Sequence, residues 1–107
     1  MTSPSPIDFG SLAALIDTDD PARLREIADL FARSSIRMLA RLQEDWARGD
    51  TKAVKVTAHG WKGAAKQACA APLAEALARI EADLPEAAEA IAEVERRFQA
   101  LQNWIDN

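Results

Sequence analysis

The sequence predicts an all-α fold: an antiparallel up-down four-helix bundle with a short additional N-terminal helix. About half of the 107 residues are hydrophobic, and much of this share is alanine, the residue with the highest helix propensity. Tyrosine is absent, runs of β-branched residues are short, and most of the few glycines and prolines lie at expected element boundaries. Four amphipathic stretches joined by short connections favour helices that pack in alternating directions.

The first twenty residues contain a lead-in and one short helix. Residues 1–7 are rich in serine and proline and are expected to form a flexible lead-in, which leaves residues 8–107 as one helical domain. Residues 8–16 can form the short first helix. Asp20 is then placed as an N-cap, and Pro21 suits the first position of a second helix.

The second helix is predicted over residues 21–48, because positions of one face recur at three- and four-residue steps. These positions are Leu24, Ile27, Ala28, Phe31, Ser35, Met38, Leu39, Leu42 and Trp46. Gly49 is suited to end this helix, and Asp50 to cap the next one.

Three further helices follow with the same helical spacing of apolar residues. The third is predicted over residues 51–68, the fourth begins near Pro72, and Pro85 ends the fourth and opens the fifth. Their apolar stripes are Val54, Ala58, Trp61, Ala65 and Ala68; Leu73, Ala76, Leu77, Ile80 and Leu84; and Ile91, Val94, Phe98, Leu101 and Ile105.

The composition argues against several classes of protein. The net charge is −4, so nucleic-acid binding is not expected. Cys69 is the only cysteine, which excludes an intramolecular disulfide and leaves no zinc-type spacing. The N-terminus lacks the basic and apolar segments of a signal peptide, and no apolar run is long enough to span a membrane, so we expect a cytoplasmic protein.

The third helix carries the only histidine, His59, together with every lysine of the chain. At 100° per residue, the residues within about 60° of His59 form what we call the basic face. They are Lys52, Lys55, Val56, Lys62, Gly63 and Lys66. The core stripe of this helix lies roughly opposite, so His59 is predicted to be exposed at mid-helix, inside a basic patch.

A neutral imidazole exposed near neutral pH can act as a nucleophile. Hydrolysis is disfavoured, since no second histidine, serine or cysteine is placed as a partner and a convex helix face offers no pocket. A metal site would need more ligands than one histidine among lysines. A phosphoryl group fits better, because Lys62 can reach its oxygens and Gly63 leaves open surface beside the ring. Gly60 lies off the basic face and suggests only helix packing.

The stretch Ala58-His59-Gly60-Trp61-Lys62-Gly63 resembles the core signature of the histidine-containing phosphotransfer (HPt) domain of bacterial multistep phosphorelays. That signature is Ala-His, a variable residue, an apolar residue, then Lys-Gly. The resemblance covers roughly residues 8–105. Supporting positions are Phe31, the Gly49-Asp50 turn, Leu73 and the apolar-Glu pair Ile80-Glu81.

The resemblance implies that His59 is the phosphoacceptor, that Lys62 stabilises the phosphoryl group and that Gly63 allows a receiver domain to approach. The partners would be receiver domains of hybrid histidine kinases and response regulators, and Mg²⁺ would belong to the receiver rather than to this chain, which is expected to bind no cofactor. The chain would be a monomeric phosphoryl carrier, not an enzyme, since it has no glycine-rich nucleotide loop for a kinase activity of its own.

Docking is expected around His59. A hairpin turning at Gly49-Asp50 brings the middle of the second helix to the level of His59. The candidate docking residues are Lys52, Lys55, Val56, Lys66, Ile36, Arg37 and Arg41.

Two positions depart from the family pattern. Cys69 stands where a glycine is common, so the third helix is expected to run on to Ala70 or Ala71. Trp61 replaces the usual aliphatic residue, with Gly60 making room for the neighbouring helix around it.

Three other interpretations remain open. The chain could be a non-catalytic helical interaction module that binds an acidic protein through its lysines. It could be a homodimer that uses Trp104 and the last helix. It could also be an HPt-like piece of a larger kinase, although an initial Met and an end soon after the last helix favour a free-standing protein.

Overall fold

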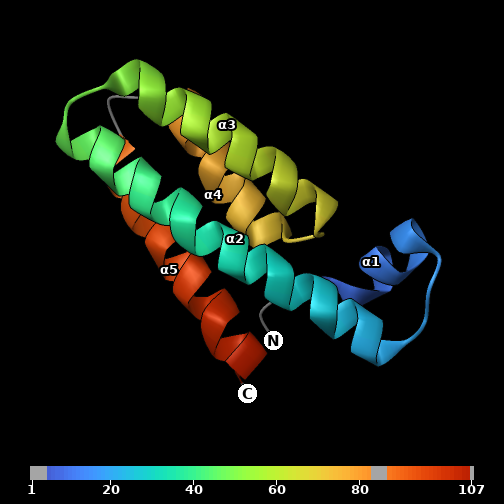
Figure 1. The fold of residues 1–107 in the computed structure, drawn as a ribbon. Coiled ribbons are helices and arrows are strands. Elements are labelled where there is room, and N and C mark those ends of the chain that lie inside the picture. The colour runs from blue at the N-terminus through green and yellow to red at the C-terminus, as the bar shows by residue number, and fades with distance from the viewer. Residues whose placement is uncertain (1–4, 83–86, 107) are drawn as a thin grey trace.

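The computed structural model describes residues 5–82 and 87–106, and its regular structure is helical throughout (Figure 1). The predicted all-α fold class is therefore confirmed. The helices are α1 (Phe9–Ile16), α2 (Pro21–Ala47), α3 (Thr51–Gln67), α4 (Ala71–Ala82) and α5 (Ala87–Asp106). The predicted core residue Leu84 and the predicted helix start at Pro85 lie outside the described residues.

The predicted starts of α2 and α3, and the turn between these two helices, are confirmed. Asp20 caps α2 by accepting a hydrogen bond from the Ala22 amide at 3.0 Å, with Pro21 at the first helical position. Asp50 caps α3 by accepting from the Ala53 amide at 3.1 Å. Gly49 has a φ of +71°, a left-handed conformation that favours glycine, and so allows the tight turn between α2 and α3.

Four helices surround the core: α2 packs on α3 and α5, α3 packs on α4, and α4 packs on α5 (Figure 1). Hydrogen bonds join Asp45 to Thr57 and Ser35 to Trp61, so α2 and α3 run in opposite directions. The predicted stripes of α3 and α4 that the structure describes are buried. On α5, Ile91, Val94, Phe98 and Leu101 are buried as predicted.

One core prediction on α2 is wrong. Trp46 is 37% exposed, whereas Asp45 beside it is buried. The Asp45 carboxylate accepts hydrogen bonds from Thr57 at 3.1 Å and from Arg48 at 2.7 Å. Because these partners satisfy the buried charge, the last turn of α2 presents its acid rather than its indole to α3.

The N-terminal segment packs on the same end of the molecule as the connection between α3 and α4. Ile7, which the sequence assigned to the flexible lead-in, is only 1% exposed. The Asp8 amide donates a hydrogen bond to the Cys69 carbonyl at 3.0 Å. The ring centroids of Phe9 and of Trp104 on α5 are 5.1 Å apart. The core therefore extends one residue before the predicted domain start.

The predicted continuation of α3 to Ala70 or Ala71 is wrong, because α3 ends at Gln67. Cys69 follows in the left-handed conformation, with a φ of +58°. The amides of Ala70 and Cys69 donate to the carbonyls of Ala65 and Lys66, the Schellman pattern that ends many helices. Cys69 thus adopts the conformation that glycine usually provides, and α4 can begin at Ala71.

Candidate functional site

The rotation of α3 about its axis is fixed by Trp61. This side chain is fully buried, its indole N–H donates to Ser35 Oγ at 2.9 Å, and its ring meets Phe98 edge-on at 6.0 Å. With Trp61 held against α2 and α5, the opposite side of α3 faces solvent. His59 lies there with 73% of its side chain exposed, as the sequence predicts.

A glutamate from α4, Glu81, joins His59 to Lys62. Its Oε2 lies 3.0 Å from His59 Nδ1, and its Oε1 lies 2.7 Å from Lys62 Nζ. Glu81 and Lys62 are 24% and 20% exposed, so both are largely shielded while the imidazole is not. The structure thus assembles a His-Glu-Lys cluster across two helices. Sequence reasoning noticed Glu81 only as part of the Ile80-Glu81 pair and gave it no role.

The charge of Glu81 determines which imidazole nitrogen of His59 carries the proton and which has the lone pair. The hydrogen bond from the Lys62 ammonium, helped by the one from His59, holds the pKa of Glu81 below its ordinary value, so its carboxylate stays ionised at neutral pH. An ionised carboxylate only accepts hydrogen bonds, so His59 Nδ1 must carry the proton of this contact. In the neutral ring, Nε2 then has the lone pair and is the nucleophilic atom.

The two glycines near His59 differ in their surroundings. A Cβ added at Gly63 would have nothing within 4 Å, so the predicted open surface beside His59 is present. A Cβ at Gly60 would meet only the terminal methyl of Met38, at 4.0 Å, which is an ordinary contact. The expectation that Gly60 makes room for a neighbouring helix around Trp61 is therefore wrong, and nothing in the structure explains this glycine.

The basic face has the predicted exposure apart from Lys62, which is turned toward Glu81. Val56 is the most exposed large apolar side chain of the described residues, at 66%. Lys52, Lys55 and Lys66 are exposed on the same helix.

The candidate docking residues of α2 divide into two groups. Arg37 and Arg41 line a surface hollow with Met38, whose methyl group lies nearest to Gly60, so they lie on the α3 side of α2. Ile36 is exposed. It lies seven residues before Gln43, whose side-chain amide donates a hydrogen bond to Glu95 on α5. Because residues seven apart share a helix face, the structure does not bring Ile36 to the surface around His59.

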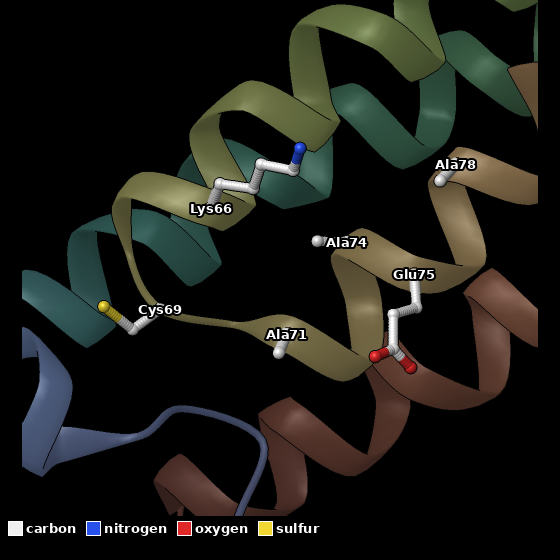
Figure 2. A pocket seen from close by; sticks show the side chains of 6 residues that line it. All are labelled: Lys66, Cys69, Ala71, Ala74, Glu75 and Ala78. Carbon is white, nitrogen blue, oxygen red and sulfur yellow. The ribbon is translucent and has the colours of Figure 1, made fainter.

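A second hollow lies between α3 and α4 (Figure 2). Lys66 and Cys69 line it from the end of α3 and the connection that follows, and α4 contributes Ala71, Ala74, Glu75 and Ala78. Helical spacing places it next to the His-Glu-Lys cluster, since Lys66 is one turn after Lys62 and Ala78 about one turn before Glu81. Sequence reasoning did not anticipate this hollow, because it depends on how α3 and α4 pack.

Across residues 5–82 and 87–106, no helix combines the length and the apolar character that a membrane span needs. No group of three or more histidine, cysteine or acidic side chains in them could hold a metal ion.

Comparison with known families supports the resemblance seen in the sequence. The family model described as the Hpt domain matches residues 26–104, from the first turns of α2 to near the end of α5. Searches of curated proteins and of solved structures give no match. The matched span covers well over half of the chain and includes His59, Lys62 and Glu81. The chain therefore belongs to the Hpt domain family, whose members carry phosphoryl groups in phosphorelays without kinase activity of their own.

Proposed function

We propose that this protein is a histidine phosphotransfer protein that accepts a phosphoryl group on His59 from a receiver-domain aspartate and relays it to the aspartate of another receiver. One observation carries the proposal: an exposed imidazole whose Nδ1 contacts a carboxylate, with a lysine held on the same carboxylate. This arrangement presents Nε2 as a nucleophile on a surface that another folded domain can reach.

The proposed transfer requires no proton movement at His59. The Nε2 lone pair attacks the phosphorus of the donor aspartyl phosphate; the N–P bond forms, the P–O bond breaks, and its electron pair returns to the donor carboxylate. In the onward step an acceptor carboxylate attacks the phosphorus and the N–P pair returns to Nε2. The Nδ1 proton stays on the ring, hydrogen-bonded to Glu81, in both directions.

Lys62 is proposed to stabilise the transferred group. Its ammonium lies on the same helix face as His59, one turn away, and a phosphoryl group on Nε2 would give it an additional anionic partner. The Mg²⁺ required for transfer is assigned to the acidic site of the receiver, and no cofactor is assigned to this chain.

The proposed docking surface is the basic face together with Arg37 and Arg41, and Ile36 is left out of it. Gly63 allows close approach, Val56 provides an apolar contact, and Lys52, Lys55 and Lys66 attract an acidic receiver. The partners would be receiver domains of hybrid histidine kinases and of response regulators. Their complexes are expected to be transient, because one carrier must visit at least two partners.

The structural setting of this proposal is an antiparallel up-down bundle of α2 to α5 that acts as a cytoplasmic monomer. The indole of Trp104, a possible dimer contact in the sequence, packs within the chain against Phe9. A homodimer through Trp104 would have to displace or extend this contact.

A phosphotransfer profile against the receiver domains of the source organism tests the proposal. A phosphorylated receiver should label the wild-type chain with an acid-labile, base-stable phosphoryl group, and His59→Gln should abolish labelling. His59 is exposed, so the variant should keep the wild-type helicity and melting temperature. Labelling that persists in His59→Gln contradicts the assignment. Binding and biological activity that persist without His59 would favour the phosphate-free interaction module.

In the same assay, Lys62→Ala should slow transfer by about 10- to 100-fold. This is the effect expected from losing one hydrogen bond to a charged group, which contributes about 1.5–3 kcal/mol. Lys66→Ala is the matched comparison, because it removes a docking lysine one turn farther from His59. It should weaken association with the receiver but leave the transfer rate at saturating receiver unchanged. An unchanged rate in Lys62→Ala would remove this residue from the proposed mechanism.

A further inference from the structure

Glu81 has a position that the proposed transfer does not by itself explain. Its Oε1 is fully buried against Lys62, and its Oε2 contacts the ring nitrogen that does not react. A neutral acceptor such as glutamine could also accept a hydrogen bond from Nδ1 and so fix the same tautomer. Fixing the tautomer of His59 therefore does not explain why the residue at this position is negatively charged.

Phosphorylation changes the charge balance of the His-Glu-Lys cluster. In the reactive form, in which attack by Nε2 requires a neutral imidazole, the charges of the Glu81 carboxylate and the Lys62 ammonium cancel. A phosphoryl group adds a charge approaching −2 at Nε2. The imidazole then carries the phosphoryl dianion at Nε2 and contacts the Glu81 carboxylate at Nδ1, and the Lys62 ammonium is the one cation of the cluster. Because the two anionic groups are this close, they repel each other.

Lys62 is the group for which the two anions compete. In this structure its ammonium is 2.7 Å from Glu81, and its side chain is only 20% exposed. Any hydrogen bond that Lys62 makes to a phosphoryl oxygen is shared with Glu81. The carboxylate thus weakens the interaction that would otherwise hold the phosphoryl group on His59.

Glu81 also affects the ring as a leaving group. When an acceptor oxygen attacks the phosphorus and the N–P bond breaks, the electron pair returns to Nε2. With the Nδ1 proton retained by the carboxylate, the ring departs as a neutral imidazole. If the phosphorylated ring lost that proton, it would depart as an imidazolate anion, which is a much poorer leaving group.

We propose that the Glu81 carboxylate raises the phosphoryl-transfer potential of His59, so that the group is passed on rather than retained. This inference rests on the proposed function. It assigns Glu81 a regulatory role on the transfer equilibrium, acting through Lys62 and the Nδ1 proton.

The test compares the full-length chain with Glu81→Gln, which keeps the size and a hydrogen-bond acceptor but removes the charge. Each is equilibrated with a phosphorylated receiver, and the ratio of phosphohistidine to aspartyl phosphate is measured. Glu81→Gln should shift this ratio toward His59 by roughly tenfold, as expected for one nearby unit charge. Its isolated phosphohistidine should also hydrolyse several-fold more slowly than the wild type.

Glu75→Gln is the matched control: it makes the same change on an exposed glutamate of the same helix and should leave the ratio unchanged. A wild-type chain that is never labelled on His59 would overturn the proposed function and this inference together. Normal labelling with an unchanged ratio in Glu81→Gln, or an equal shift in Glu75→Gln, overturns this inference alone.

A measurement on the wild type covers the case in which Glu81→Gln does not fold. ³¹P NMR of the phosphorylated chain reports the pH at which Nδ1 loses its proton. The carboxylate contact should raise this value above that of free phosphohistidine. A value equal to that of the free amino acid would overturn the inference.

Discussion

At the residue scale, the imidazole of His59 is held at one nitrogen by Glu81 while most of its surface stays exposed. The exposure of His59, its lysine neighbours and the open space at Gly63 were predictable, because all of these lie on one helix whose angular spacing is known. Glu81 was not predictable in this role. It lies 22 residues from His59, and only the packing of α3 on α4 decides that their side chains meet.

Gly63 offers a test in which stability and activity should change in opposite directions. Gly63→Ala should raise the free energy of unfolding by about 1 kcal/mol, because alanine favours the helix and its methyl group meets no atom. Phosphotransfer should slow by roughly tenfold, since an extra methyl in a close interface costs about 1–3 kcal/mol.

Gly60→Ala is the control for this prediction, because Gly60 is also exposed in α3 but points toward Met38. It should gain similar stability and keep its transfer rate. Both properties can be measured by thermal unfolding and by receiver-to-histidine transfer kinetics. A Gly63→Ala chain that transfers at the wild-type rate would show that no receiver backbone approaches this position.

At the element scale, α3 is positioned by its buried side and terminated by its last turn. The apolar stripe correctly predicted which side of α3 faces the core, since Trp61 and its neighbours on the stripe are buried. The hydrogen bond from Trp61 to Ser35 was not foreseen, although it satisfies the indole N–H inside the core. The end of α3 was mispredicted because a cysteine gives no signal for a left-handed residue, whereas glycine does.

Cys69 gives a prediction about this turn. A side chain in the left-handed conformation costs about 1–2 kcal/mol, so Cys69→Gly should be at least as stable as the wild type despite the lost packing. Cys69→Ala keeps the backbone cost and loses the half-buried thiol, and should be less stable by about 0.5–1 kcal/mol. Chemical denaturation measures both. Equal destabilisation of the two variants would show that the turn stores no such strain.

At the scale of the whole molecule, charge is unevenly distributed. The chain has a net charge of −4, yet its four lysines all lie on α3 around the phosphoacceptor candidate. The fold class and most of the core could be predicted from periodicity alone. The misplacements were at the ends of elements: Trp46 at the last turn of α2, where a buried acid takes the inner position, and Ile7 before α1. At such ends, tertiary contacts rather than helical spacing decide burial.

This charge distribution predicts how docking responds to salt. Raising ionic strength from 0.1 M to 1 M shortens the Debye length from about 10 Å to about 3 Å, so association with an acidic receiver should slow markedly. Neutralising Lys52, Lys55 and Lys66 to glutamine should slow association by roughly tenfold at low salt and flatten the salt dependence. Stopped-flow binding to a receiver measures both effects.

The control removes the same number of charges from other surfaces, with Arg23, Arg96 and Arg97 changed to glutamine. These arginines pair with acidic residues of their own helices α2 and α5. This variant should associate at close to the wild-type rate. Equal slowing in both triple variants would mean that only the overall charge matters, not its position on α3.

The N-terminal segment has a consequence for anyone who wishes to trim this domain. The family match begins at residue 26, inside α2, so a fragment cut to that match would lack Asp20 as the helix cap and the buried Leu24. It would also remove Ile7 and Leu12, which are nearly inaccessible to solvent, and the amide that bonds to the Cys69 carbonyl. The boundaries of the family and of the folding unit do not coincide, and the residues ahead of α2 belong with the domain in any shortened version.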